Sequence, residues 1–209
     1  NLPKPIFAVG QTGTLVRSTI QAGNFDFDMA KALSGAAIKQ GVYLQEHNAD
    51  YLEDVFLLAH IPARVSAANV APEFGVAETR SYLELYELER ILVECCMIKR
   101  EASSNLRTVL LKEAVKTKRW RKWVSSDKMS MSYEEVMRDE KMSDEILEIA
   151  GQYTLNCAMV KKEIKRMLSN LENVGIDGNE FVKNRIKMAI LRYVDCFNLS
   201  GLNRRIKTL

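Results

Sequence analysis

Long apolar runs are missing from this sequence. No window approaches the roughly 18 uncharged apolar residues of a membrane-spanning helix, and the opening Asn1-Leu2-Pro3-Lys4-Pro5 lacks the pattern of a signal peptide. A cytoplasmic protein without a membrane partner is therefore expected. The absence of an initiator methionine, with a strand pattern almost at the first residue, suggests a piece of a longer chain.

Histidine and cysteine are scarce. Only two histidines are present, whereas a catalytic zinc site typically has about three protein ligands. The four cysteines show no metal-type spacing, so no metal site is predicted within this chain. All four are expected to be reduced. Cys95 and Cys96 are neighbours on a helical pattern and are interpreted as core residues rather than as a redox pair.

Nucleotide-binding fingerprints are absent as well. Neither a G-x-G-x-x-G pattern nor a G-K-[ST] pattern occurs, so no motif supports kinase chemistry. The turn Gly10-Gln11-Thr12-Gly13-Thr14 could cradle a phosphate with its backbone amides, as glycine-rich turns do. A plain turn without a ligand explains the same residues equally well.

The sequence has no strong excess of charge of either sign. Its net charge of +3, from 30 basic and 27 acidic residues, does not indicate nucleic acid as a partner. One stretch, residues 116–123, interleaves basic residues with Trp120 and Trp123. It could stack nucleobases, but tryptophans at helical spacing more often anchor a helix while the basic side chains stay in solvent. We therefore predict an anchor and no nucleic-acid partner.

The first half of the chain repeats a pattern of a short apolar run followed by a helix. Three such units in succession predict parallel strands with right-handed crossovers and helices over the sheet, which is the α/β class. Three strands are too few to close a barrel, so other strands must come from outside this sequence. The predicted strands are residues 6–9, 42–45 and 64–70, and the predicted helices are 27–40 after an Asp26 N-cap, 50–59 and 77–100.

The second half shows helical patterns only. Ser132 and Glu135 have the spacing of a capping box, and Ser143 has the position of a helix N-cap. The chain is therefore divided into residues 1–100, with three βα units, and residues 101–209, an all-helical C-terminal extension. Further helices are predicted from residue 104 or 105 to 116, from about 153 to 171, and from 181 to 197.

Polar residues follow each predicted strand. Because the carboxyl ends of parallel strands meet at one edge of a sheet, these residues are expected to form a ligand site. Glu46 and His47 have the chemistry for acid–base catalysis. Loops are polar in any protein, however, and Asp50 could simply be an N-cap. The predicted ligand-binding residues are Gln11, Thr14, Asn48, Asp50, Asn69 and Glu73; His60, before Ile61-Pro62, is interpreted as a helix C-terminal or surface residue.

Several stretches resemble one family. They are Val9-Gly10-Gln11-Thr12-Gly13-Thr14, Glu46-His47-Asn48-Ala49-Asp50-Tyr51, Asn69-Val70-Ala71-Pro72-Glu73-Phe74-Gly75, Arg119-Trp120-Arg121-Lys122-Trp123 and Ser143-Asp144-Glu145-Ile146. Together they are similar to the non-catalytic subunit of class II D-tagatose-bisphosphate aldolase, a family whose members also carry the name tagatose 6-phosphate kinase. The similarity runs over most of the chain and thins after about Gly175.

The resemblance implies a partial TIM (βα)8 barrel, of which this chain holds the last three βα units. It also implies a role in carbohydrate metabolism, in galactitol or tagatose catabolism. The expected partners are a small phosphosugar and either a catalytic aldolase subunit, further copies of the chain, or both. Any divalent metal, such as zinc, would be held mainly by residues outside this chain.

Three functions are therefore compared. The leading hypothesis is a protein that supports a class II aldolase or binds a phosphosugar at the strand ends. The alternative is an enzyme in its own right, either an aldolase-like lyase, an epimerase or a tagatose 6-phosphate kinase, with Glu46 or His47 as the acid–base group. The third is a nucleic-acid-binding module that uses residues 116–123.

Overall fold

A computed structural model describes residues 5–202 and 204. The chain forms two compact units. The first contains the described residues up to Phe74 and again from Met188 onward, and the second comprises Gly75–Lys187. These bounds differ from the predicted regions 1–100 and 101–209, because the C-terminal segment returns to the βα units.

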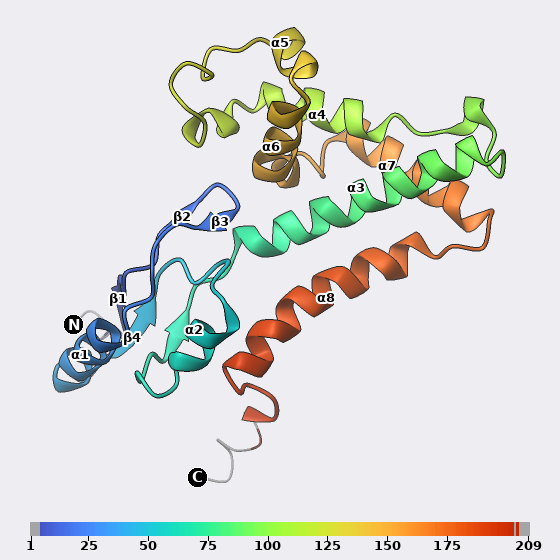
Figure 1. Ribbon diagram of the computed structural model, residues 1–209. Helices are drawn as coiled ribbons and strands as arrows, with labels where there is room; N and C mark the ends of the chain where they lie inside the picture. Colours follow the sequence, from blue (N-terminus) through green and yellow to red (C-terminus); the bar gives the residue numbers. More distant parts are fainter. Residues whose placement is uncertain (1–4, 203, 205–209) are drawn as a thin grey trace. The chain divides into compact units, whose positions relative to one another are not determined.

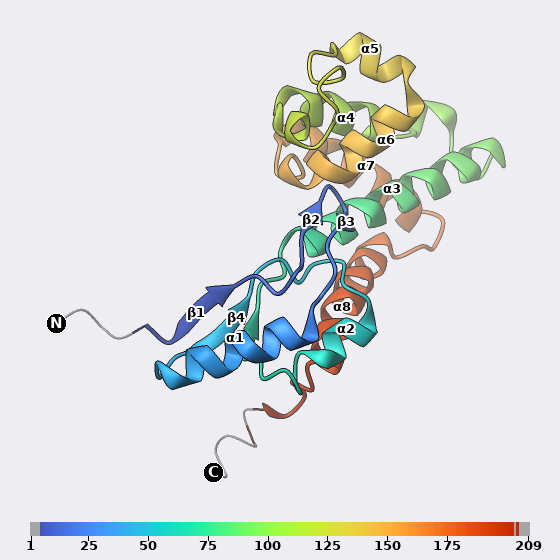
Figure 2. The same ribbon diagram turned by 60° about the vertical axis from the view of Figure 1, so that its left-hand side comes forward.

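The first unit contains a three-stranded parallel sheet. Its strands are β1 (Phe7–Gly10), β4 (Tyr43–Glu46) and β5 (Ala67–Ala68), in the order β1-β4-β5. Gly10 pairs with Glu46, and Glu46 pairs with Ala68. Figures 1 and 2 show β1 and β4 side by side with α1 next to them. The parallel pairing agrees with the βα pattern in the sequence, while the partial barrel remains a prediction.

An antiparallel hairpin precedes the first helix. It consists of β2 (Val16–Arg17) and β3 (Ile20–Gln21), with Val16 opposite Gln21. The predicted strands do not include this segment, because two-residue strands are too short to show an alternating pattern. Gly13 lies next to the hairpin at φ +93°, where an added Cβ would lie 2.2 Å from the carbonyl oxygen of Asn24. Only glycine fits this close approach.

Helix α1 (Phe27–Lys39) begins as predicted and ends one residue before the predicted Gln40. The Asp26 side chain accepts a hydrogen bond of 2.8 Å from the backbone N–H of Met29, and Gly41 follows the helix at φ 69°. The helix packs on one face of the sheet, since a Cβ added to Gly10 would contact Leu33 of α1 at 3.5 Å. On the other face Phe7, Val9 and Tyr43 are exposed.

Helix α2 (Asp54–Ala59) starts later than the predicted residue 50. The reason is that Asp50 does not cap this helix. Its Oδ1 accepts hydrogen bonds from the backbone N–H groups of Ala71 and Glu73, at 2.9 and 3.0 Å, and so caps the next long helix, α3 (Pro72–Glu94). Pro72 suits the first turn of that helix, where no N–H is needed.

Helix α3 begins and ends earlier than the predicted 77–100. Its end is followed by Cys96 at φ 59°, a left-handed conformation typical of helix C-termini. Cys95 and Cys96 are consequently exposed, and their predicted role in the core is wrong. All four cysteines are free.

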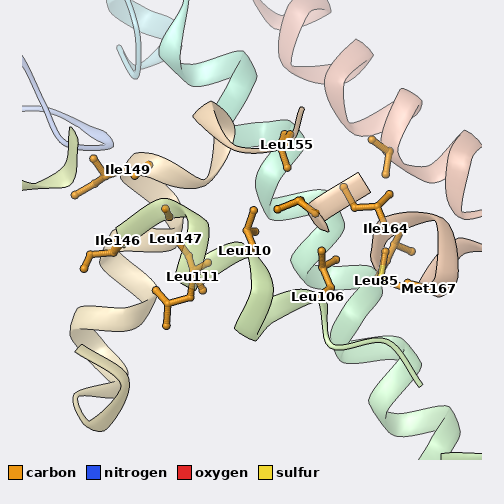
Figure 3. Packing of buried hydrophobic residues seen from close by; sticks show 14 of the residues in the cluster. Leu85, Leu106, Leu110, Leu111, Ile146, Leu147, Ile149, Leu155, Ile164 and Met167 are labelled. Carbon is orange, nitrogen blue, oxygen red and sulfur yellow. The ribbon is translucent and has the colours of Figure 1, made fainter. Parts of the chain in front are cut away.

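The second unit is helical within the described residues. Buried Leu, Ile and Met side chains from several helices make up most of its core, which Figure 3 shows around Leu110. Val182, on the first half of α8, also lies in this core. After α3 the elements are η1 (Arg100–Ala102), α4 (Leu106–Lys116), η2 (Arg119–Lys122), α5 (Tyr133–Arg138), α6 (Glu140–Ala150), η3 (Gly151–Tyr153), α7 (Ala158–Glu172) and α8 (Gly178–Cys196).

The two predicted caps in this unit have different outcomes. Ser132 and Glu135 form the capping box that their spacing predicts. Ser143 is not an N-cap, because α6 begins at Glu140 with Asp139 as the cap. The Ser143 hydroxyl instead donates a 2.8 Å hydrogen bond to the carbonyl oxygen of Val136, which lets this residue stay buried inside a helix.

The basic aromatic stretch is partly an anchor. Trp120 is fully buried, and its Nε1 donates a 3.1 Å hydrogen bond to the carbonyl oxygen of Val115. Trp123 is 46% exposed. The prediction of a tryptophan anchor is thus confirmed for Trp120 alone. None of the helices in the described residues combines the length and the apolar character that crossing a bilayer requires.

Candidate functional site

The predicted site residues follow three strands whose last residues are paired with one another. Gly10, Glu46 and Ala68 are paired across the sheet. The ladder continues by one residue beyond them, since the N–H of His47 donates to Gly10 O at 3.2 Å and the N–H of Asn69 donates to Glu46 O at 3.0 Å. Residues 11, 47 and 69 therefore lie next to one another at the carboxyl edge of the sheet.

Gln11, His47 and Asn69 are exposed at this edge, and we call them the strand-end rim. Asn69 Oδ1 accepts a 2.6 Å hydrogen bond from Gln45 Nε2, which orients its amide. Two amides and an imidazole on adjacent strands can donate and accept hydrogen bonds, and the imidazole can also transfer a proton. This set suits a polyhydroxylated ligand.

Glu46 lies beneath the rim and is fully buried. The hydroxyl of Thr12 donates to its Oε2, and the hydroxyl of Thr14 lies 2.5 Å from its Oε1. Thr14 Oγ1 is also 2.9 Å from the carbonyl oxygen of His47. The turn after β1 is thereby joined to the end of β4, because both oxygens of one buried carboxylate are occupied by threonines of that turn.

The loop after His47 is held by the hairpin. Gln21 Nε2 lies 3.0 Å from the carbonyl oxygens of both Asn48 and Asp50. Asn48 has a φ of 66°, in the left-handed region that Asn tolerates better than most residues. The loop conformation thus depends on β3, whose two residues are too few to give a strand pattern in the sequence.

Asp50 and Glu73 form hydrogen bonds within the first unit. Burial raises the pKa of the Asp50 carboxyl, although the backbone N–H groups of Glu73 and Ala71 act in the opposite direction. Glu73 Oε2 accepts a 2.5 Å hydrogen bond from the N–H of Tyr51. Both carboxylates therefore fasten the β4–α2 loop to the start of α3.

Two residues of α8, Arg192 and Tyr193, also bind Glu73 and form a hydrogen-bond network with it. Arg192 binds Glu73 Oε1 through Nη1 at 3.2 Å and Asp54 Oδ1 through Nε at 2.6 Å. The Tyr193 hydroxyl donates to Glu73 Oε2, and burial and this hydrogen bond raise its pKa. Sequence reasoning missed Arg192 and Tyr193, because nothing local to α8 indicates that residues more than a hundred positions earlier are their partners.

His60 lies in the core of the first unit. It follows α2 at the C-terminal cap, as predicted, but it is buried and not a surface residue. Its ring stacks on Phe25 with centroids 4.6 Å apart, and Nδ1 lies 2.8 Å from the carbonyl oxygen of Phe56. Burial lowers the pKa of its imidazole.

The described residues do not provide a donor set for a metal. Among residues 5–202 and 204, no group of three or more His, Cys, Asp and Glu side chains gathers where it could hold an ion. The carboxylates nearest to His47 in sequence are occupied by hydroxyl and backbone donors. The residues present therefore do not fit a catalytic zinc ion, which needs about three protein ligands.

Comparison with solved structures finds a similar fold. No protein-family profile and no curated protein sequence matches the chain. The crystal structure of a probable tagatose 6-phosphate kinase from Sinorhizobium meliloti 1021 is similar with a TM-score of 0.64 and 17% sequence identity. The match covers 91% of this chain and 52% of that protein, so this chain spans about half its length. At this identity the likeness shows a shared fold.

Proposed function

We propose that this chain is part of a (βα)-barrel protein of carbohydrate metabolism that binds a phosphorylated sugar at the strand-end rim. The observation that carries this proposal is that Gln11, His47 and Asn69 are exposed at adjacent positions on the carboxyl edge of a parallel sheet. Ligands of parallel α/β folds bind at this edge. The name of the structurally similar tagatose 6-phosphate kinase supports the same class of ligand.

Glu46, which lies beneath the rim, is better placed to support ligand binding than to act in catalysis. A general acid or base must reach a substrate proton, whereas the Glu46 carboxylate is buried under two threonine hydroxyls. Glu46 would then position the rim. Within the proposal, the chain supports a catalytic class II aldolase subunit, with Asn48, Asp50 and Glu73 holding the loops around the ligand.

An enzyme in its own right is the second candidate, and the exposure of His47 favours it. This imidazole has no hydrogen bond to any side chain among the described residues, so it is accessible for proton transfer. Purified protein that cleaves tagatose 1,6-bisphosphate, or phosphorylates tagatose 6-phosphate with ATP, would establish this alternative if His47→Ala abolished the activity.

Binding of the sugar can be tested by calorimetry with tagatose 6-phosphate. The Gln11→Ala/Asn69→Ala double variant is expected to weaken binding roughly tenfold or more, the result of losing two hydrogen bonds to the ligand. Gln40→Ala is the matched control, because Gln40 is an exposed amide that precedes β4 rather than following it. Equal affinities of the double variant and the control would contradict the strand-end site.

The supporting role requires a separate measurement. Adding this protein to the catalytic subunit of a class II tagatose-bisphosphate aldolase should lengthen the half-life of its activity, since a partner that binds only the folded state stabilises it. An unchanged half-life and no complex in size-exclusion chromatography would remove that role and leave sugar binding to be judged by calorimetry.

A further inference from the structure

The second unit contains a polar pocket of about 530 Å³ that plays no part in the proposed function. It is lined by residues of α3 and α7, by residues around η3 and by Asn179 at the start of α8. Leu155 and Ile164 belong both to this lining and to the buried cluster of the unit, where Figure 3 labels them. The pocket therefore has an apolar base formed by the core.

One wall carries two lysines. Lys161 and Lys165 are exposed and lie one turn apart on α7, so their side chains are neighbours on one face of the helix. Neither forms a salt bridge with a described residue. Like charges at this spacing repel each other, and a bound anion would relieve this repulsion.

A second wall, formed by α3, carries hydrogen-bond acceptors. Glu78 and Tyr82 are one turn apart on α3, both partly buried. Within the described part of the chain, the Glu78 carboxylate has no hydrogen bond or ion pair. Burial, and secondarily the charge of Glu78, raises the pKa of the Tyr82 hydroxyl. Gln152 and Asn156 add two amides.

We propose that this pocket is a second ligand site, which takes a small phosphorylated polyhydroxy compound. Lys161 and Lys165 bind the phosphate, and Glu78 accepts hydrogen bonds from hydroxyl groups at the other wall. The volume suits such a ligand, because small-molecule pockets begin at about 300 Å³. The site lies wholly in the helical unit and is distinct from the strand-end rim.

The combination of charges argues for this ligand class. A bare anion would satisfy the lysines and leave the carboxylate of Glu78 without a donor. An uncharged sugar would satisfy Glu78 and the amides of Gln152 and Asn156. It would offer no anionic group to the two lysines, which form no salt bridge with Glu78 or with Glu172, the other carboxylate of the lining. A phosphorylated polyol has a phosphate for the two lysines and hydroxyl groups for Glu78, so one molecule can bind both walls.

The test uses the full chain and three probes, glucose 6-phosphate, inorganic phosphate and glucose, in calorimetry at low salt. Glucose 6-phosphate should bind more tightly than either of the others. The Lys161→Gln/Lys165→Gln variant should bind it roughly tenfold or more weakly. Lys162→Gln/Lys187→Gln is the matched control, with the same change in net charge at two exposed lysines outside the pocket.

A second variant tests the α3 wall. Glu78→Ala should lower affinity for glucose 6-phosphate and leave the affinity for inorganic phosphate unchanged. The proposal is overturned if the control variant weakens binding as much as the pocket variant, if the pocket variant binds normally, or if wild-type protein prefers inorganic phosphate. The Gln11→Ala/Asn69→Ala variant should keep this binding, so failure of one site is distinguishable from failure of the other.

Discussion

The hydroxyl of Thr14 lies 2.5 Å from Oε1 of the fully buried Glu46. Thr14→Val should therefore leave one oxygen of a buried carboxylate without its donor and lower the free energy of unfolding by about 1–3 kcal/mol. Urea denaturation measures the change. In a Glu46→Gln background the same substitution should cost less, since a neutral amide is less costly to leave partly unpaired. Equal costs in the two backgrounds would show that the hydroxyl–carboxylate contact is not what stabilises the turn.

Tyr193→Phe removes a single hydroxyl from α8. That hydroxyl donates to Glu73, and it is 3.3 Å from the carbonyl oxygen of Ala49. We expect a loss of about 1–2 kcal/mol in the free energy of unfolding. Tyr43→Phe is the control, because the Tyr43 side chain is 54% exposed. A loss for Tyr43→Phe as large as that for Tyr193→Phe would argue against the Glu73 network.

His60 should make stability depend on pH. Its folded-state pKa is lowered by burial from 6.5, with Glu46 as the nearby charge that acts in the opposite direction. Since the unfolded chain then binds the proton more readily, the stabilising contribution is present above about pH 6.5 and is lost as pH falls below it. His60→Leu should reduce the loss of stability between pH 7.5 and pH 5.5. Identical pH profiles for wild type and His60→Leu would contradict the assignment.

The two tryptophans of the basic stretch should respond differently to truncation. Trp120→Ala empties a fully buried site and breaks the hydrogen bond to Val115, so we expect a loss of about 3–5 kcal/mol. Trp123→Ala should change stability by no more than about 0.5 kcal/mol. Chemical denaturation followed by circular dichroism measures both. Similar losses for the two variants would mean that Trp123 also has a buried partner.

Local signals in the sequence were sufficient for several helix ends. Asp26 caps α1, and Ser132 and Glu135 form a capping box, because these bonds join residues only three positions apart. Similarly, the short apolar runs before helices predicted parallel strands, and the structure pairs β1, β4 and β5 in parallel. The Ser143 cap failed because Asp139, four residues earlier, meets the same local requirement.

The sequence by itself determined where the polar strand-end residues lie, since strand register and the carboxyl-edge rule depend on the order of elements along the chain. Only the tertiary structure decided their roles. It buries Glu46 under Thr12 and Thr14, exposes His47, and turns Asp50 and Glu73 toward backbone and α8 donors. The physical reason is that a carboxylate takes its role from the donors that surround it, and here those donors come from distant segments.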